Sequence, residues 1–243
     1  FRAECKIANR LIHVADRDGC VLDLGCGIGF WTEYFARRFS RVVAVEASRP
    51  LYEALKLRCT PYPNVELMHG DVKQFQPADK YDVVFLGGIL MYLNEQDVIS
   101  LLENLIPALQ PRGVILCRET TIRKETTTRQ GDYQAVYRSV AHYERIFAEC
   151  ELSVRNVKIN TPYVAMQMGC ELVKKWKGIM PPPLHCLPVV GRLAYWGLRL
   201  GYPWITRVPM ALGLTYPELT NHFFVLHSDS HPITDGVART QVA

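Results

Sequence analysis

The chain has 243 residues, of which 49% are hydrophobic and 21% charged, and its formal net charge is +4. This composition excludes an intrinsically disordered or collagen-like chain and is ordinary for a globular protein of one large domain. The small basic excess permits an anionic partner. It does not indicate a nucleic-acid-binding domain, which usually carries a dense basic face.

Strand-like and helical patterns alternate through the first two thirds of the chain. Short apolar runs predict buried strands at residues 21–24, 42–45, 65–68, 82–86, 114–117 and 152–159. Helical periodicity predicts helices at 30–39, 51–59, 94–109 and 136–150, with a turn at Pro111-Arg112-Gly113. Strands separated by helices of this length predict βαβ units and a parallel sheet that is covered on both faces.

Residues 161–217 break this pattern. They hold eight of the fifteen prolines and three of the four tryptophans, and they precede a last strand at 221–226. A segment of this length is too long for an ordinary loop, so we expect an insertion with its own helices at 166–177 and 189–200. The polar tail that follows contains His227 and His231, which we expect to be solvated and not to bind a metal.

The eight cysteines predict neither a disulfide framework nor a metal site. No pair has C-x-x-C spacing or a histidine at zinc-ligand spacing, and several lie in apolar runs, where cysteine behaves as a small hydrophobe. We therefore expect a reducing, cytoplasmic compartment. The longest stretch without charge, 178–191, contains four prolines and is too short for a membrane-spanning helix.

The sharpest motif is Val21-Leu22-Asp23-Leu24-Gly25-Cys26-Gly27-Ile28-Gly29-Phe30, in which a buried strand enters a glycine loop and then a helix. Glycines allow positive φ angles and let a ligand approach the backbone closely. A dinucleotide fingerprint would place the third glycine one residue later. Asp23 also suits a positively charged ligand group better than a pyrophosphate, so the motif argues against NAD.

Two further acidic residues lie at or just after the ends of the second and third strands, where they could bind a nucleoside. Glu46 ends the second strand, where a carboxylate can accept both hydrogen bonds of a ribose diol. Asp71 follows the third strand, where it can meet an adenine amino group. The fourth strand ends in Gly87-Gly88, where a ligand can lie against the backbone.

With these motifs, residues 10–160 and 220–227 resemble the class I S-adenosylmethionine-dependent methyltransferases. The resemblance implies a Rossmann-like α/β fold with a seven-stranded, mostly parallel sheet in the order 3-2-1-4-5-7-6, its last strand antiparallel. It implies a core of residues 1–160 and 218–228, an inserted helical segment at 161–217 between strands six and seven, and a tail at 229–243. It implies S-adenosyl-L-methionine as cofactor and S-adenosyl-L-homocysteine as product, without a metal. The implied cofactor-binding residues are Asp23, Gly25, Gly27, Gly29, Glu46, Ala47, Asp71, Val72 and Gly87.

The sequence identifies the residues that would bind the methyl acceptor less clearly than those that would bind the cofactor. Glu119 closes the fifth strand and could take a proton or orient an amine, although a surface salt bridge is an equal alternative. His142 is a second catalytic candidate, although a packed or capping histidine is more common on such a helix. Tyr92, Tyr133 and Tyr137 are candidates for the acceptor pocket or for half-buried packing. The fourth strand lacks the Asn/Asp-Pro-Pro-aromatic signature of relatives that methylate nucleobases, so we expect no nucleic-acid substrate.

The inserted segment carries the basic excess. Residues 161–217 contain six lysines and arginines against Glu171 alone, a net charge of +5. A basic, tryptophan-bearing helix can form a lid over an apolar substrate, lie in a membrane interface, or make a dimer contact. All three alternatives remain open.

The sequence therefore predicts an S-adenosylmethionine-dependent methyltransferase, a transferase that methylates an oxygen or nitrogen of a small organic molecule, such as one of secondary metabolism. A lipid or isoprenoid-like acceptor at a membrane surface is the alternative. A non-catalytic cofactor-binding module and an NAD-dependent oxidoreductase are less favoured. We expect a partly apolar small-molecule acceptor and allow for a homodimer and peripheral membrane contact.

Overall fold

The computed structural model describes residues 1–12, 18–130, 134–181, 188–212 and 218–229. Seven strands form one sheet in the order β3-β2-β1-β4-β5-β9-β8, and β6 pairs separately with β7. The strands are β1 (Cys20–Leu24), β2 (Arg41–Glu46), β3 (Val65–His69), β4 (Tyr81–Leu86), β5 (Leu109–Ile122), β6 (Thr127–Arg129), β7 (Ala135–Tyr137), β8 (Leu152–Ile159) and β9 (Leu219–Ser228).

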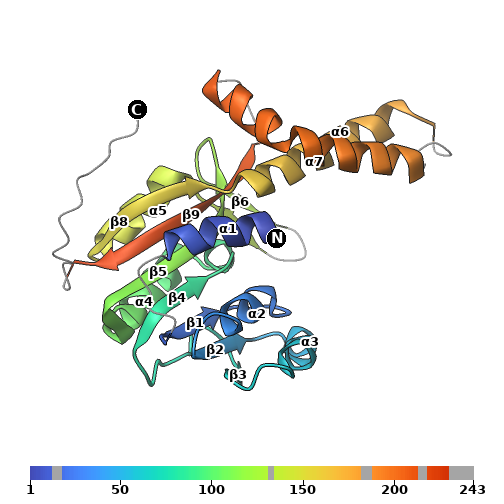
Figure 1. Cartoon of the computed structure of the whole chain (residues 1–243). Helices are drawn as coiled ribbons and strands as arrows, with labels where there is room; N and C mark the ends of the chain where they lie inside the picture. The colour runs from blue at the N-terminus through green and yellow to red at the C-terminus, as the bar shows by residue number, and fades with distance from the viewer. Residues whose placement is uncertain (13–17, 131–133, 182–187, 213–217, 230–243) are drawn as a thin grey trace.

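The helices cover both faces of the sheet, and α6 and α7 extend away from it (Figure 1). The helices are α1 (Arg2–Leu11), α2 (Phe30–Ala36), α3 (Arg49–Cys59), α4 (Glu95–Leu105), α5 (Val140–Glu149), α6 (Thr161–Ile179) and α7 (Pro188–Ala211). Two short 3-10 helices are η1 (Leu90–Tyr92) and η2 (Ile106–Ala108).

The predicted sheet is confirmed. The strands from β3 to β5 run parallel, and β9 runs antiparallel to both β5 and β8. In order along the chain, β8 and β9 are therefore the predicted sixth and seventh strands. The inserted helices α6 and α7 lie between them in sequence, as predicted.

Side-chain alternation along the central strands builds a core on each face of the sheet. Val21 and Phe85 pack with α1 and α2 residues on one face, whereas Leu22 and Leu86 pack with α4 and α5 residues on the other. All four side chains are at most 1% exposed. This burial on both faces explains the continuous apolar runs of the parallel strands.

Several predicted boundaries are wrong, and each has a local cause. The predicted helix at 136–150 begins only at Val140, because the Ser139 side chain caps it and residues 135–137 pair with β6. The predicted turn at 111–113 lies within the span of β5, where the pairing with β4 shifts register. Helix α4 ends before the 3-10 turn that contains Pro107.

Other differences concern helix α1, the two inserted helices and the end of β9. Helix α1 was not predicted, and the helices predicted at 166–177 and 189–200 are longer in the structure. His227 is only 7% exposed, because β9 extends through it and buries it, so its predicted solvation is wrong. His231 and the tail beyond Asp229 lie outside the described residues.

Candidate functional site

The glycine loop adopts a backbone that only glycine tolerates well. The φ angles of Gly25, Gly27 and Gly29 are 67°, 58° and 82°. A Cβ atom on Gly29 would lie 2.5 Å from the Leu55 side chain, so this glycine also allows α2 and α3 to pack closely. A Cβ atom on Gly27 would meet nothing within 4 Å. Gly27 therefore borders open space, which a ligand at the loop requires.

Glu46 connects the end of β2 to this loop. Its carboxylate accepts the Gly27 N–H at 2.8 Å and the Ser48 N–H at 2.7 Å, and the residue is 7% exposed. Each carboxylate oxygen has a second lone pair, so the group can still accept hydrogen bonds from a diol. The adjacent predicted residue, Ala47, is exposed, and its carbonyl contacts the His69 ring at 3.0 Å.

Strand pairing places the third predicted acid near Glu46. Glu46 pairs with His69 at the ends of β2 and β3, and Asp71 follows two residues later. Asp71 is exposed and accepts the Lys73 N–H at 3.0 Å, whereas Val72 is 5% exposed and belongs to the core. The structure therefore brings Glu46 and Asp71 to the same edge of the sheet and leaves the Asp71 side chain accessible.

Asp23 lies deeper than the other acids. It sits within β1, is 1% exposed and accepts the Thr32 hydroxyl at 2.7 Å. Burial, with a smaller contribution from the nearby charge of Glu46, raises the pKa of Asp23 to about 7 against the lowering effect of the Thr32 hydrogen bond. Its observed contact fixes α2 against β1. The predicted contact of Asp23 with the methionyl end of the cofactor stays a prediction.

Glu119 organises the turn that follows β4. One carboxylate oxygen, Oε1, accepts the N–H groups of Gly88 and Leu90, both at 3.2 Å. The other oxygen, Oε2, is buried and has no hydrogen-bond partner among the described residues. Burial raises the pKa of Glu119 to about 8, against the lowering effect of these two hydrogen bonds and of Arg118 and Arg138. Glu119 is therefore no surface salt bridge.

Arg138, which was not among the predicted site residues, supports the same turn. Arg138 is 1% exposed, and its guanidinium donates to the carbonyl oxygens of Leu90 at 2.8 Å and Leu93 at 2.7 Å. Within the part of the chain that the structure describes, its Nε atom and the Tyr143 hydroxyl are buried and have no hydrogen-bond partner. No local pattern marks an arginine that becomes buried, and its contacts lie 45 to 48 residues away in the chain.

His142, by contrast, is engaged elsewhere. Its Nδ1 atom lies 2.6 Å from the Thr126 hydroxyl and its Nε2 atom lies 2.5 Å from a Glu95 carboxylate oxygen. Arg145 approaches the same Nε2 atom at 3.1 Å. These contacts connect α5 to α4 and do not involve the glycine loop or the turn after β4. The catalytic role of His142 stays a prediction without support from this geometry.

The tyrosine candidates are only partly placed. Tyr92 lies in η1 and is 53% exposed, and Tyr137 ends β7, which lies next to η1. The Tyr137 ring lies 5.4 Å from the Arg129 guanidinium. Tyr133 lies outside the described residues. The structure thus brings together the elements that carry Tyr92 and Tyr137, beside Gly87 and Gly88.

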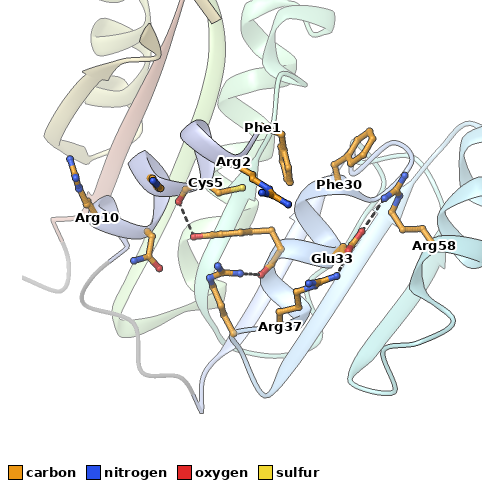
Figure 2. Close-up of a pocket in the computed structure, with 12 residues that line it drawn as sticks. Phe1, Arg2, Cys5, Arg10, Phe30, Glu33, Arg37 and Arg58 are labelled. Carbon is orange, nitrogen blue, oxygen red and sulfur yellow. Dashed lines mark hydrogen bonds and ion pairs between the residues drawn. The ribbon is translucent and has the colours of Figure 1, made fainter. Parts of the chain in front are cut away.

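Two surface hollows are lined by residues other than the tyrosines and glycines just described. One, of about 720 Å³, lies between α1, α2 and the side chain of Arg58 from α3, and Figure 2 shows Glu33 between Arg37 and Arg58 there. The other, of about 910 Å³, lies beyond the end of β5 and includes Ser139 and His222. Burial lowers the pKa of His222 to about 4, so this imidazole is neutral at physiological pH.

The fold and the glycine loop define a Rossmann-like ligand-binding domain of the methyltransferase type. Residues 21–113 match a family model described as a methyltransferase domain. The seven-stranded sheet has the Rossmann-like fold of class I S-adenosylmethionine-dependent methyltransferases, so the match and the fold together confirm the predicted resemblance. Within the part of the chain that the structure describes, no helix is long and apolar enough to span a membrane.

Curated relatives match about half of the chain. Phosphoethanolamine N-methyltransferase 1 of Triticum aestivum is 28% identical over 134 residues, which are 54% of this chain and 27% of that protein. Ribosomal RNA small subunit methyltransferase A of Alkaliphilus metalliredigens is 29% identical over 152 residues, which are 59% of this chain and 53% of that protein. The chain therefore spans about a quarter to a half of the length of these relatives.

Solved structures share the fold over almost the whole chain. A SAM-dependent methyltransferase of Leishmania major has a TM-score of 0.63 at 16% identity, covering 93% of this chain and 72% of that one. An O-methyltransferase from a trans-AT polyketide synthase of Brevibacillus brevis, in complex with S-adenosyl-L-homocysteine, has a TM-score of 0.64 at 15% identity, covering 95% and 76%.

S-adenosylmethionine is the cofactor of this class of domain, and the residues present fit it. The open space at Gly27 and the remaining lone pairs of Glu46 meet the requirements of its nucleoside portion. Among the described residues, no group of His, Cys, Asp and Glu has the arrangement of a metal site.

Proposed function

We propose that this protein transfers a methyl group from S-adenosylmethionine to a nitrogen or oxygen atom of a small organic acceptor. The observation that carries the proposal is the position of Glu46 and Glu119 at one edge of the sheet. Leu24, Val45, Leu86 and Cys117 lie at equivalent register on the four central strands. Glu46 is one residue beyond this line, and Glu119 is two residues beyond it.

The strands that carry these two carboxylates are separated by a distance comparable to the length of the cofactor. Strands β1 and β4 lie between β2 and β5, so three strand spacings, about 14 Å, separate the two strands. Glu46, beside the glycine loop, would hold the ribose end of the cofactor. Gly87 and the turn that Glu119 supports would adjoin its methionyl end. Ligands of open α/β sheets bind at this carboxyl edge of the strands.

For methyl transfer, the protein must mainly align the methyl donor with the acceptor atom. When bound, the cofactor supplies a methyl group whose carbon–sulfur bond breaks as the bond to the acceptor forms, and the sulfur retains the electron pair. The acceptor loses its proton to a base or to solvent. Burial raises the pKa of Glu119 to about 8, a range that suits a general base. The side chain is fully buried and its Oε1 atom accepts two backbone N–H groups, so its contribution would be to position the turn after β4.

The matched proteins include methyltransferases named for small acceptors and methyltransferases named for ribosomal RNA. The wheat relative is named a phosphoethanolamine N-methyltransferase and the Brevibacillus structure an O-methyltransferase. The bacterial relative is named a ribosomal RNA methyltransferase. In this chain, however, the segment after β4 reads Gly87-Gly88-Ile89-Leu90 and lacks the signature expected for a nucleobase substrate. A lipid-like acceptor remains the alternative to a soluble metabolite.

The test combines binding with transfer. Calorimetry should show binding of S-adenosylhomocysteine, and radiolabelled S-adenosylmethionine should label an acceptor from a panel of phosphoethanolamine, small phenols, lipid extract and short RNA. Label in a small amine or hydroxyl compound would support the proposal. No cofactor binding, or label in RNA alone, would overturn it. Label in the lipid fraction would select the alternative.

A further inference from the structure

Helix α7 carries an apolar stripe that faces solvent. Its members follow one another at intervals of three or four residues, so they share one face of the helix. Their exposed fractions range from 42% for Val208 to 73% for Leu200. The stripe consists of Val189, Leu193, Trp196, Leu200, Trp204 and Val208. An amphipathic helix normally turns such a face toward the core, so the exposure of this stripe requires another explanation.

The position of α7 keeps the stripe away from the sheet. The start of helix α6 is fixed to the sheet. Asn160 caps the helix, and its side-chain amide donates to the Asn221 side chain at 2.8 Å. In the first turns of the helix, Val164 and Ala165 are buried. Farther along, Val173 and Ile179 of α6 are exposed. Helix α7 packs on α6, and the pair extends away from the core (Figure 1). This arrangement does not close over the glycine loop as a lid would.

The surroundings of the stripe are cationic and aromatic. Arg199 donates to the Tyr195 hydroxyl at 2.8 Å, and its guanidinium lies 5.3 Å from the Trp196 ring. Arg192 and the α6 lysines 174, 175 and 177 are exposed. The sequence of α7 contains no acidic residue. Exposed leucines beside tryptophan, tyrosine and arginine are the side chains that favour the interface of an anionic bilayer.

We propose that this stripe binds the surface of an anionic membrane, with α7 lying in the interface plane. Its 24 residues include the arginines at 192, 199 and 207, and no described helix meets the requirement for a membrane span. A symmetric contact between the α7 helices of two copies is disfavoured, because α7 contains arginines and no acidic residue, so the contact would bring two sets of cations together. The anionic surface supplies the complementary charge. This inference is independent of the acceptor proposed above.

The experiment uses the whole chain with vesicles of phosphatidylcholine alone or of phosphatidylcholine mixed with phosphatidylglycerol. Co-sedimentation should show binding to the anionic vesicles, weaker at high salt, with a blue shift of tryptophan emission. The double variant Leu193→Glu/Leu200→Glu should reduce this binding by roughly tenfold or more, because two apolar contacts are lost. Arg192→Glu/Arg199→Glu should reduce binding to anionic vesicles specifically.

Leu57→Glu provides the matched control, since Leu57 on α3 is 80% exposed but has no place in the stripe. It should leave vesicle binding unchanged. Circular dichroism should show the same helix content for all variants. Absence of binding to anionic vesicles would overturn the proposal, as would equal loss in the Leu57 and stripe variants. Sedimentation velocity that shows a dimer abolished by the stripe variant, without vesicle binding, would instead assign the stripe to a second copy.

Discussion

Glu119 and Arg138 bind the backbone of the same residue, Leu90, from two directions. Glu119 accepts its N–H at 3.2 Å, and Arg138 donates to its carbonyl oxygen at 2.8 Å. Both side chains are at most 1% exposed. The turn after β4, where Gly87 and Gly88 would adjoin the reacting end of the cofactor, is therefore held by two buried polar side chains, a carboxyl group from β5 and a guanidinium from the segment before α5.

The first prediction concerns Arg138. Arg138→Met would leave the carbonyl oxygens of Leu90 and Leu93 without their donor and would remove a positive charge from near Glu119. We expect the free energy of unfolding to fall by about 3 kcal/mol. Denaturant-induced unfolding measures this loss.

The control is Arg129→Met. The Arg129 side chain is 46% exposed and pairs with Glu218 at 2.7 Å, so its loss should cost less than about 1 kcal/mol. Equal costs for the two variants would show that the buried contacts of Arg138 contribute no more to stability than a surface ion pair.

The second prediction is a pH dependence of stability. Burial raises the pKa of Glu119 from 4.5 to about 8, so the folded state binds a proton that the unfolded state releases between these values. This contribution to the free energy of unfolding is full below pH 4.5 and is lost as the pH rises through 8. Asp23, with a pKa of about 7, adds a contribution of the same sign.

Unfolding measured at a series of pH values should therefore show stability falling from mildly acidic to mildly basic conditions. Glu119→Gln should reduce the slope between pH 4.5 and about 8, and Asp23→Asn should reduce it between pH 3.8 and about 7. A slope unchanged in both variants would contradict the assignment of these protons.

The third prediction concerns Glu46. Glu46→Ala removes the acceptor of the Gly27 and Ser48 N–H groups and the proposed ribose contact. We expect S-adenosylhomocysteine to bind more weakly by at least about 1 kcal/mol in calorimetry. Glu66→Ala is the control, because Glu66 lies on the adjacent β3 and pairs with Arg41 at the surface. Affinity that is equal in the two variants would remove the ribose assignment.

The fourth prediction separates two glycines of one loop. Both Gly27→Ala and Gly29→Ala force a positive φ angle on alanine, at a cost of about 1–3 kcal/mol each. Only at Gly29 would the new Cβ also collide with Leu55. We expect Gly29→Ala to lower the free energy of unfolding more, and Gly27→Ala to weaken cofactor binding while destabilising less.

Thermal unfolding and calorimetry on both variants distinguish these effects. The reverse order, with the larger stability loss at position 27, would show that Gly27 borders packed protein and not open space.

The sequence by itself determined the order of the sheet strands and the residues at the carboxyl edge of the sheet, where the cofactor is proposed to bind. Buried parallel strands need continuous apolar runs, and the glycines and acids that follow β1 and β2 are local in sequence, so a pattern of short range reveals them. Glu119 was identified for the same reason, because it lies just beyond the apolar run of β5.

Only the tertiary structure decided how Arg138 and α7 are used. The partners of Arg138 lie more than forty residues away, and nothing in Tyr137-Arg138-Ser139 distinguishes a buried arginine from a surface one. The periodicity of α7 likewise predicts an apolar face but not its direction. Burial depends on which elements pack against that face, and here α6 holds α7 with the stripe turned to solvent.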